Sequence, residues 1–167
     1  MNPMVSRKLV EVTADPLEKL AFIFTFPAED APTMDGQTQE VVRVDFNGPF
    51  GGGMELSLPA SALGELAVNM LGAEDGEELS PEQQRDALKE LINVVCGNLL
   101  PVLAGHAEEF NLRPPYMVCG ESPAWGDPIA VGYLMLENGS CRVRMRLDGS
   151  PEPCLPGLDA ADGLLSN

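Results

Sequence analysis

Four residues in the middle of the chain have types and a spacing that could do chemistry: Asp86, Glu90, Asn93 and Gly97. An α-helix turns by about 100° per residue, so on a helix these positions fall within about 60° of one another. Carboxylates accept hydrogen bonds and pair with cations, whereas a carboxamide both donates and accepts and does not titrate. The four residues would therefore form one polar stripe, and we use that name for them below.

The polar stripe is costly for a helix that needs only a solvated face. Asparagine is a mediocre helix former, and a glycine inside a helix costs roughly 1 kcal/mol relative to alanine. Gly97 also removes a side chain beside Glu90 and Asn93, so another surface could approach closely. The alternative is an ordinary wet face that tolerates an asparagine, and the residues alone leave both interpretations open.

The helix that must carry the polar stripe has a clear start signal at Ser80-Pro81-Glu82-Gln83. Serine caps, proline suits the first helical position, and glutamine three residues on completes a capping box. We expect this helix to run at least to Leu100, and Pro101 to kink or break it. Apolar residues lie opposite the stripe and should face the core: Leu88, Leu91, Ile92, Val95 and Leu99.

Two further helices are expected. Residues 15–25 read as a helix that starts at Asp15 and Pro16, although it could instead begin near Val5, with Pro16 as a kink. Residues 59–71 carry apolar residues at helical spacing, and Gly72 stops them.

The strands are expected from alternation and turn residues. Residues 40–46 and 54–58 should pair as a hairpin across the glycine-rich turn 48–53, after a loop over 27–38. Residues 116–120, 129–137 and 141–147 are also strand-like, and Asn138-Gly139 marks a tight hairpin.

This order of elements predicts an α+β fold, with an antiparallel or mixed β-sheet and long helices packed on one face. We expect one domain over residues 1–149. Residues 150–167 contain several prolines and acids and are expected to form a flexible acidic tail.

The charge balance limits the partners. The chain has 167 residues, with 10 Lys and Arg against 26 Asp and Glu and a formal net charge of -16. Nucleic-acid binding usually needs a basic face, so none is expected. No apolar run approaches the roughly 20 residues of a membrane helix, and the N-terminus does not resemble a secretory signal, so no membrane insertion is expected.

The cysteines and the histidine give no sign of a metal or catalytic centre. Cys96, Cys119, Cys141 and Cys154 form no Cys-x-x-Cys pair, so we expect no metal site and reduced thiols in a cytoplasmic protein. His106 is the only histidine, and it belongs to no nucleophile pattern.

The motif Asp86-x-x-x-Glu90-x-x-Asn93, with a proline further along, resembles the signature of the CheC/CheX/FliY family of chemotaxis phosphatases. The Gly97-Asn98 pair and the strand-then-helix segment 53–72 resemble the same family, and the likeness extends from about residue 40 to 120. The downstream proline, Pro114 or Pro115, lies slightly closer than in the family pattern.

Two such sites are usual in CheC-like members and one in CheX-like members. The first half of this chain offers only Glu18-Lys-Leu-Ala21, with alanine where a second site would need asparagine. The chain therefore resembles the CheX type, whose members often dimerise through their sheets.

The resemblance implies an enzyme that hydrolyses the aspartyl phosphate of a CheY-like response regulator. Asn93 would orient the attacking water, and Glu90 would pair with the regulator's active-site lysine. Asp86, Gly97 and Asn98 would contact the partner. The chain would need no cofactor of its own, because the regulator's site supplies magnesium. The alternative is a non-catalytic module of the same fold that binds a response regulator or a flagellar switch.

Overall fold

The computed structural model describes residues 1–33, 36–74, 76–119, 124–149 and 155–158. Its helices are α1 (Pro3–Lys19), α2 (Leu63–Leu71), which follows a 3-10 turn at Ala60–Ala62, and α3 (Pro81–Ala104). The strands are β1 (Phe26–Ala28), β2 (Gln39–Asn47), β3 (Gly52–Pro59), β4 (Asn111–Leu112), β5 (Tyr116–Met117), β6 (Ala130–Leu136) and β7 (Gly139–Leu147).

The strands form one seven-stranded sheet in the order β1-β6-β7-β3-β2-β4, with β5 also paired to β2. Every described pairing is antiparallel. The two long hairpins, β2–β3 and β6–β7, meet where β3 pairs with β7. This architecture confirms the predicted α+β fold class.

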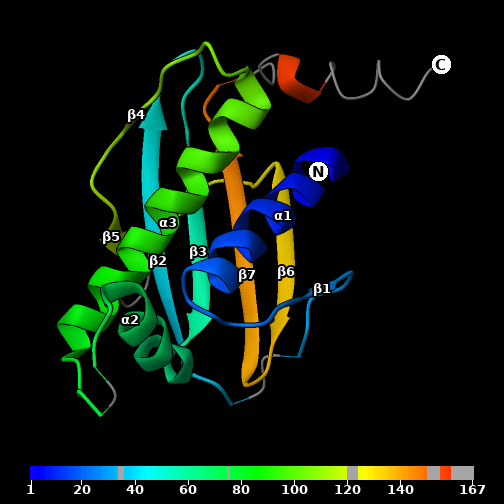
Figure 1. The fold of residues 1–167 in the computed structure, drawn as a ribbon. Coiled ribbons are helices and arrows are strands. Elements are labelled where there is room, and N and C mark those ends of the chain that lie inside the picture. The colour runs from blue at the N-terminus through cyan, green and yellow to red at the C-terminus, as the bar shows by residue number, and fades with distance from the viewer. Residues whose placement is uncertain (34–35, 75, 120–123, 150–154, 159–167) are drawn as a thin grey trace.

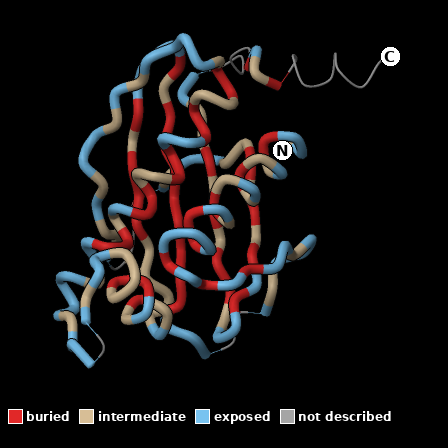
Figure 2. Tube along the Cα trace, viewed as in Figure 1, coloured by how far each residue is buried: buried red, intermediate tan, exposed pale blue. Residues whose placement is uncertain are grey.

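The three helices lie on one face of the sheet, and α3 runs between α1 and α2 (Figure 1). Strand residues alternate between the two faces. On β7, Cys141, Val143 and Met145 are buried towards the helices, and their neighbours point to the opposite face. We call that opposite face the open face. The core lies between the sheet and the helices, as the buried segments in Figure 2 show.

The first helix differs from the favoured prediction. It begins at Pro3 and ends at Lys19, so the prediction of a helix over 15–25 was wrong and the alternative start near Val5 is close to the structure. The cause is a cap that the sequence reading missed: the Asn2 side chain accepts from the backbone N–H groups of Met4 and Val5. Pro16 lies inside the helix.

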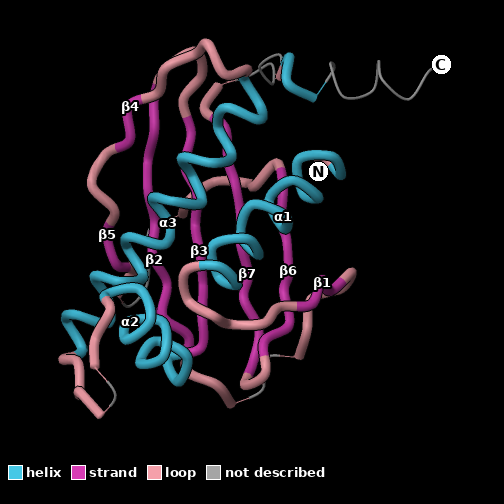
Figure 3. Tube along the Cα trace, in the orientation of Figure 1, coloured by secondary structure: helices cyan, strands magenta, loops and turns pink. Residues whose placement is uncertain are grey.

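Two short edge strands were also missed. Strand β1 lies at the boundary of the predicted loop 27–38, and β4 precedes the Arg113-Pro114-Pro115 turn (Figure 3). Both are too short to show alternation, and their conformation comes from pairing with β6 and β2. In the predicted tail, Leu155 and Leu158 pack into the core. Residues 150–154 and 159–167 lie outside the described residues, so the predicted tail stays a prediction.

By length and composition alone, α3 could cross a membrane, and 56% of its most apolar window is buried inside the fold. A helix at the core of a globular domain passes the same test.

Candidate functional site

The start of α3 confirms the predicted capping box. The backbone N–H of Gln83 donates to Ser80 Oγ at 3.2 Å, and the Gln83 side chain accepts from the Ser80 N–H at 2.9 Å. Pro81 occupies the first helical position. The helix continues through Pro101 and ends at Ala104, so Pro101 does not break it. A fixed start therefore sets the orientation of every residue on the polar stripe.

The two sides of α3 differ in burial as predicted. The apolar side is fully buried, with no exposed surface at Leu88, Leu91, Ile92, Val95 and Leu99. On the other side, Asp86, Glu90, Gly97 and Asn98 are exposed and Asn93 is half-buried. Since the core holds one side of the helix, the polar stripe is presented to solvent on a rigid support.

The charged and amide groups of the polar stripe are largely without partners. Asp86 lies 3.9 Å from the Lys89 ammonium group. Within the described part of the chain, the side chains of Glu90 and Asn93 make no hydrogen bond or ion pair. Both can therefore offer their full hydrogen-bonding capacity to another molecule.

The neighbourhood of Gly97 is open. A Cβ atom built on this glycine would meet nothing within 4 Å. Its carbonyl would normally accept a bond from the residue four positions on, but that residue is Pro101, which has no N–H. Gly97 therefore adds open space and a carbonyl without its helical donor to the polar stripe.

The first half of the chain does not form a second stripe of this kind. Helix α1 ends at Lys19, so Ala21 lies beyond it and is fully buried. Glu18 accepts a hydrogen bond from Thr25 at 3.0 Å. The structure thus gives a second reason, besides the missing asparagine, why Glu18 and Ala21 do not resemble Glu90 and Asn93.

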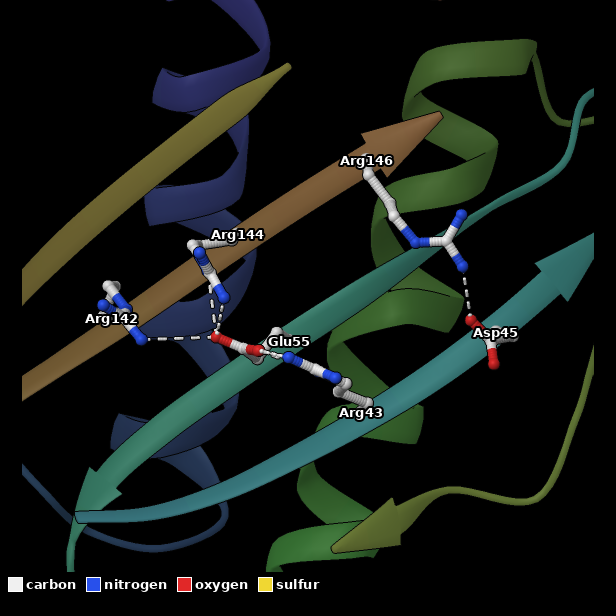
Figure 4. A network of polar contacts seen from close by, with 6 residues as sticks. All are labelled: Arg43, Asp45, Glu55, Arg142, Arg144 and Arg146. Carbon is white, nitrogen blue, oxygen red and sulfur yellow. Dashed lines mark hydrogen bonds and ion pairs between the residues drawn. The ribbon is translucent and has the colours of Figure 1, made fainter. Parts of the chain in front are cut away.

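The open face carries a cluster that sequence reasoning missed. Glu55 on β3 is 2% exposed and accepts from Arg43 on β2 and from Arg142 and Arg144 on β7 (Figure 4). Further along β7, Arg146 pairs with Asp45 at 2.8 Å and also with Asp148. The available signal was Arg142-x-Arg144-x-Arg146, which repeats with the period of a strand in a chain with few basic residues.

A tryptophan covers part of this cluster. The guanidinium carbons of Arg43, Arg144 and Arg146 lie 5.4, 5.1 and 5.5 Å from the ring centroid of Trp125. These distances are typical of cation–π contacts. Trp125 therefore holds the segment before β6 against the open face.

The cysteines that the structure describes are free: Cys96 and Cys141 are buried and Cys119 is exposed. Burial raises the pKa of both Cys96 and Cys141 to about 12. Neither thiol is therefore a nucleophile near neutral pH.

The fold is an α+β domain with an antiparallel sheet and helices on one face. Its central helix α3 carries a carboxylate and a carboxamide that have no partner among the described residues. The family described as chemotaxis phosphatase CheX matches residues 41–132, more than half of the chain. The chain therefore belongs to the CheX family. No curated protein matches the sequence.

Solved structures of this fold agree. A chemotaxis protein CheX from Desulfovibrio desulfuricans matches with a TM-score of 0.67 and 17% identity, covering 87% of this chain and 99% of that one. CheX from Vibrio vulnificus matches with a TM-score of 0.66 and 18% identity, covering 87% of this chain and 99% of that one. A chain of the CheX-CheY-BeF3-Mg²⁺ complex from Borrelia burgdorferi matches with a TM-score of 0.59 and 16% identity, covering 86% of this chain and 97% of that one. At these identities the likeness shows the fold.

Proposed function

We propose that this chain hydrolyses the aspartyl phosphate of a CheY-like response regulator in the cytoplasm, with Asn93 and Glu90 as its catalytic residues. The observation that carries the proposal is that both side chains lack a partner among the described residues. They lie on the solvent side of α3, whose other side is fully buried. Membership of the CheX family and the CheX–CheY complex from Borrelia support the same partner.

In this proposal the chain only has to orient a water molecule and hold the regulator in place. Phosphoryl transfer depends mainly on positioning and on stabilising charge. The Asn93 carboxamide would accept from and donate to the attacking water, orienting it towards the phosphorus. The Glu90 carboxylate would pair with the regulator's active-site lysine and anchor the helix. Because the two residues are three apart on one helix, a single rigid element delivers both.

The regulator's own site would supply the metal. Magnesium is present in the CheX–CheY complex from Borrelia, where it accompanies BeF3. On this chain, no group of three or more His, Cys, Asp or Glu side chains that could hold a metal ion occurs among the residues whose positions are described. We therefore assign magnesium to the regulator's site, as in that complex.

Three neighbouring residues would contact the regulator without taking part in the reaction. Asp86 is one turn before Glu90 and largely exposed, with 60% of its side chain accessible. Gly97 and Asn98 lie one turn beyond Asn93 and are exposed. The open space at Gly97 would allow the regulator's backbone or loops to approach the helix closely.

The test is the rate of phosphate loss from CheY-type regulators of the source organism, with and without this protein. We expect acceleration by the parent protein, which Asn93→Ala abolishes and Glu90→Gln reduces strongly. Matched controls are Asn47→Ala and Glu108→Gln, whose side chains are exposed and lie outside α3. Equal acceleration by Asn93→Ala and the parent protein would contradict the mechanism.

The same experiment separates the alternative function. A regulator that binds tightly but loses phosphate at its unassisted rate would identify a non-catalytic binding module. Binding is measured independently by titrating a labelled regulator, so the two readouts do not depend on each other.

We also propose a homodimer formed through the sheet. The sheet order leaves β1 at one end, so one edge of this short strand has no neighbouring strand among the described residues. Exposed edges can pair with a second chain. Light scattering coupled to size-exclusion chromatography tests this proposal, and Ala28→Pro, which would alter the edge strand, should shift the mass towards the monomer.

A further inference from the structure

The open face holds an unusual share of the basic residues. Four of the ten Lys and Arg residues of this acidic chain lie there, namely Arg43, Arg142, Arg144 and Arg146. None of them belongs to the polar stripe, which lies on the opposite side of the molecule, on the helical layer (Figure 1). The proposed phosphatase chemistry therefore does not account for them.

The cluster around Glu55 has more positive charge than its one carboxylate balances. Glu55 Oε1 lies 2.6 Å from a guanidinium nitrogen of Arg144, and at the longer distance of 3.3 Å from a guanidinium nitrogen of Arg142. Among the residues that the structure describes, the buried Nε groups of Arg142 and Arg146 have no hydrogen-bond acceptor. A second molecule cannot reach these buried Nε groups, but the Arg142 side chain is 34% exposed and shares the single carboxylate of Glu55 with two other arginines.

Arg142 is also the most accessible member of the cluster. Its side chain is 34% exposed, against 24% for Arg144 and 8% for Arg43. Trp125 stacks on the other three arginines, and the described contacts of its ring do not include Arg142. Arg142 therefore lies at the uncovered side of the open face.

An apolar row lies beside Arg142. Its partner on β6 is Tyr133, and two residues further along β6 is Met135, which is 38% exposed. Met135 pairs in turn with Phe26 on β1, which is 68% exposed. Arginine, aromatic residues and methionine are the types enriched at the centres of protein interfaces.

We propose that this side of the open face is a docking surface for an acidic segment of another protein. A carboxylate of that segment would bind the guanidinium of Arg142, and its apolar side chains would pack on Tyr133 and Met135. Charge complementarity selects the occupant, because the surface carries excess positive charge that a carboxylate would pair. A second copy docked by a two-fold axis that passes through Arg142 would bring two like charges together, which is unfavourable.

The test uses a fluorescein-labelled 12-residue peptide of alternating glutamate and leucine, titrated with the full chain and followed by fluorescence anisotropy. We expect binding that weakens as sodium chloride rises, because the pairing is electrostatic. Arg142→Gln should weaken it about tenfold or more, since the variant removes a charge-assisted hydrogen bond. Met135→Ser should weaken it by a smaller factor.

The control is Arg113→Gln, which removes the same charge from an exposed arginine near the opposite edge of the sheet. Urea denaturation of each variant checks that Glu55, still held by Arg43 and Arg144, keeps the fold intact. Equal affinity of Arg142→Gln and the parent protein for the glutamate–leucine peptide would overturn the proposal. Self-association that Arg142→Gln abolishes would also overturn it, because the occupant would then be a second copy.

Discussion

Replacing Gly97 with a larger residue should raise the stability of the protein while it lowers the rate of regulator dephosphorylation. Glycine inside a helix is less favourable than alanine by roughly 0.5–1 kcal/mol, because the unfolded chain loses more freedom on folding. The new methyl group would meet nothing within 4 Å, so no steric term offsets this gain. We therefore expect Gly97→Ala to raise the free energy of unfolding by about 0.5–1 kcal/mol, and the melting temperature by about 1–4 °C.

Function should change in the opposite direction as the side chain grows. Gly97→Leu keeps a good helix former at an exposed position, so stability should not fall below that of the parent protein. Its side chain would occupy the open space beside Asn93, where the regulator is proposed to approach. We expect at least a tenfold loss of regulator dephosphorylation from Gly97→Leu, and a smaller loss from Gly97→Ala.

Urea denaturation followed by circular dichroism measures the stabilities, and phosphate release from the regulator measures the activity. Gly64→Ala is the matched control, because Gly64 is also helical, in α2, and also has nothing within 4 Å of a built Cβ. It should add stability without changing turnover. A Gly97→Ala protein less stable than the parent would refute the packing argument, and a fully active Gly97→Leu would show that the regulator does not approach at Gly97.

Three other substitutions or reactions test the rest of the molecule. Glu55→Gln should lower the free energy of unfolding, measured by urea denaturation, by about 3–5 kcal/mol, because it leaves the surrounding arginines without their buried countercharge. A loss below about 1 kcal/mol would contradict this prediction and show that water or other groups compensate. Ser80→Ala should cost about 1 kcal/mol by removing the α3 cap, with Ser61→Ala as a control that lacks a cap bond. At pH 8, iodoacetamide should modify Cys119 but not Cys96 or Cys141, because a pKa of about 12 keeps the two buried thiols protonated. Mass spectrometry of tryptic peptides identifies the modified cysteines, and reaction of Cys96 or Cys141 in the folded protein would disprove the prediction.

The features that the sequence predicted well have local causes. The capping box at Ser80 and the glycine at position 72, which takes a left-handed conformation with φ of 66°, each act within one turn of helix. The hairpin between β6 and β7 was also predicted, but its two loop residues are Glu137 and Asn138 rather than Asn138 and Gly139, because Leu136 pairs with Gly139. The two-sided character of α3 follows from its periodicity, so the direction of the polar stripe could also be predicted.

The features that were missed depend on contacts distant in the sequence. Strand β1 exists because Phe26 pairs with Met135 on a distant strand. Helix α1 continues past Pro16 to Lys19, although Pro16 suggested a helix start. The open-face cluster joins Arg43 to Arg144 through Glu55, and no local pattern aligns three separate strands. The sequence showed arginines at every second position of β7, but it did not show that Arg142 and Arg144 share the carboxylate of Glu55.

The position of the polar stripe on α3 has a physical logic. In the proposed mechanism α3 places a carboxylate and a carboxamide in another protein's site, so it must not bend or rotate when it docks. Helix α3 contacts α1, α2 and the sheet, and its buried side consists of large apolar residues. Tilting it would expose that surface to water, at roughly 25 cal/mol for each Å². The same residues that make α3 the centre of the core therefore hold Glu90 and Asn93 in a fixed geometry, and no pocket is required.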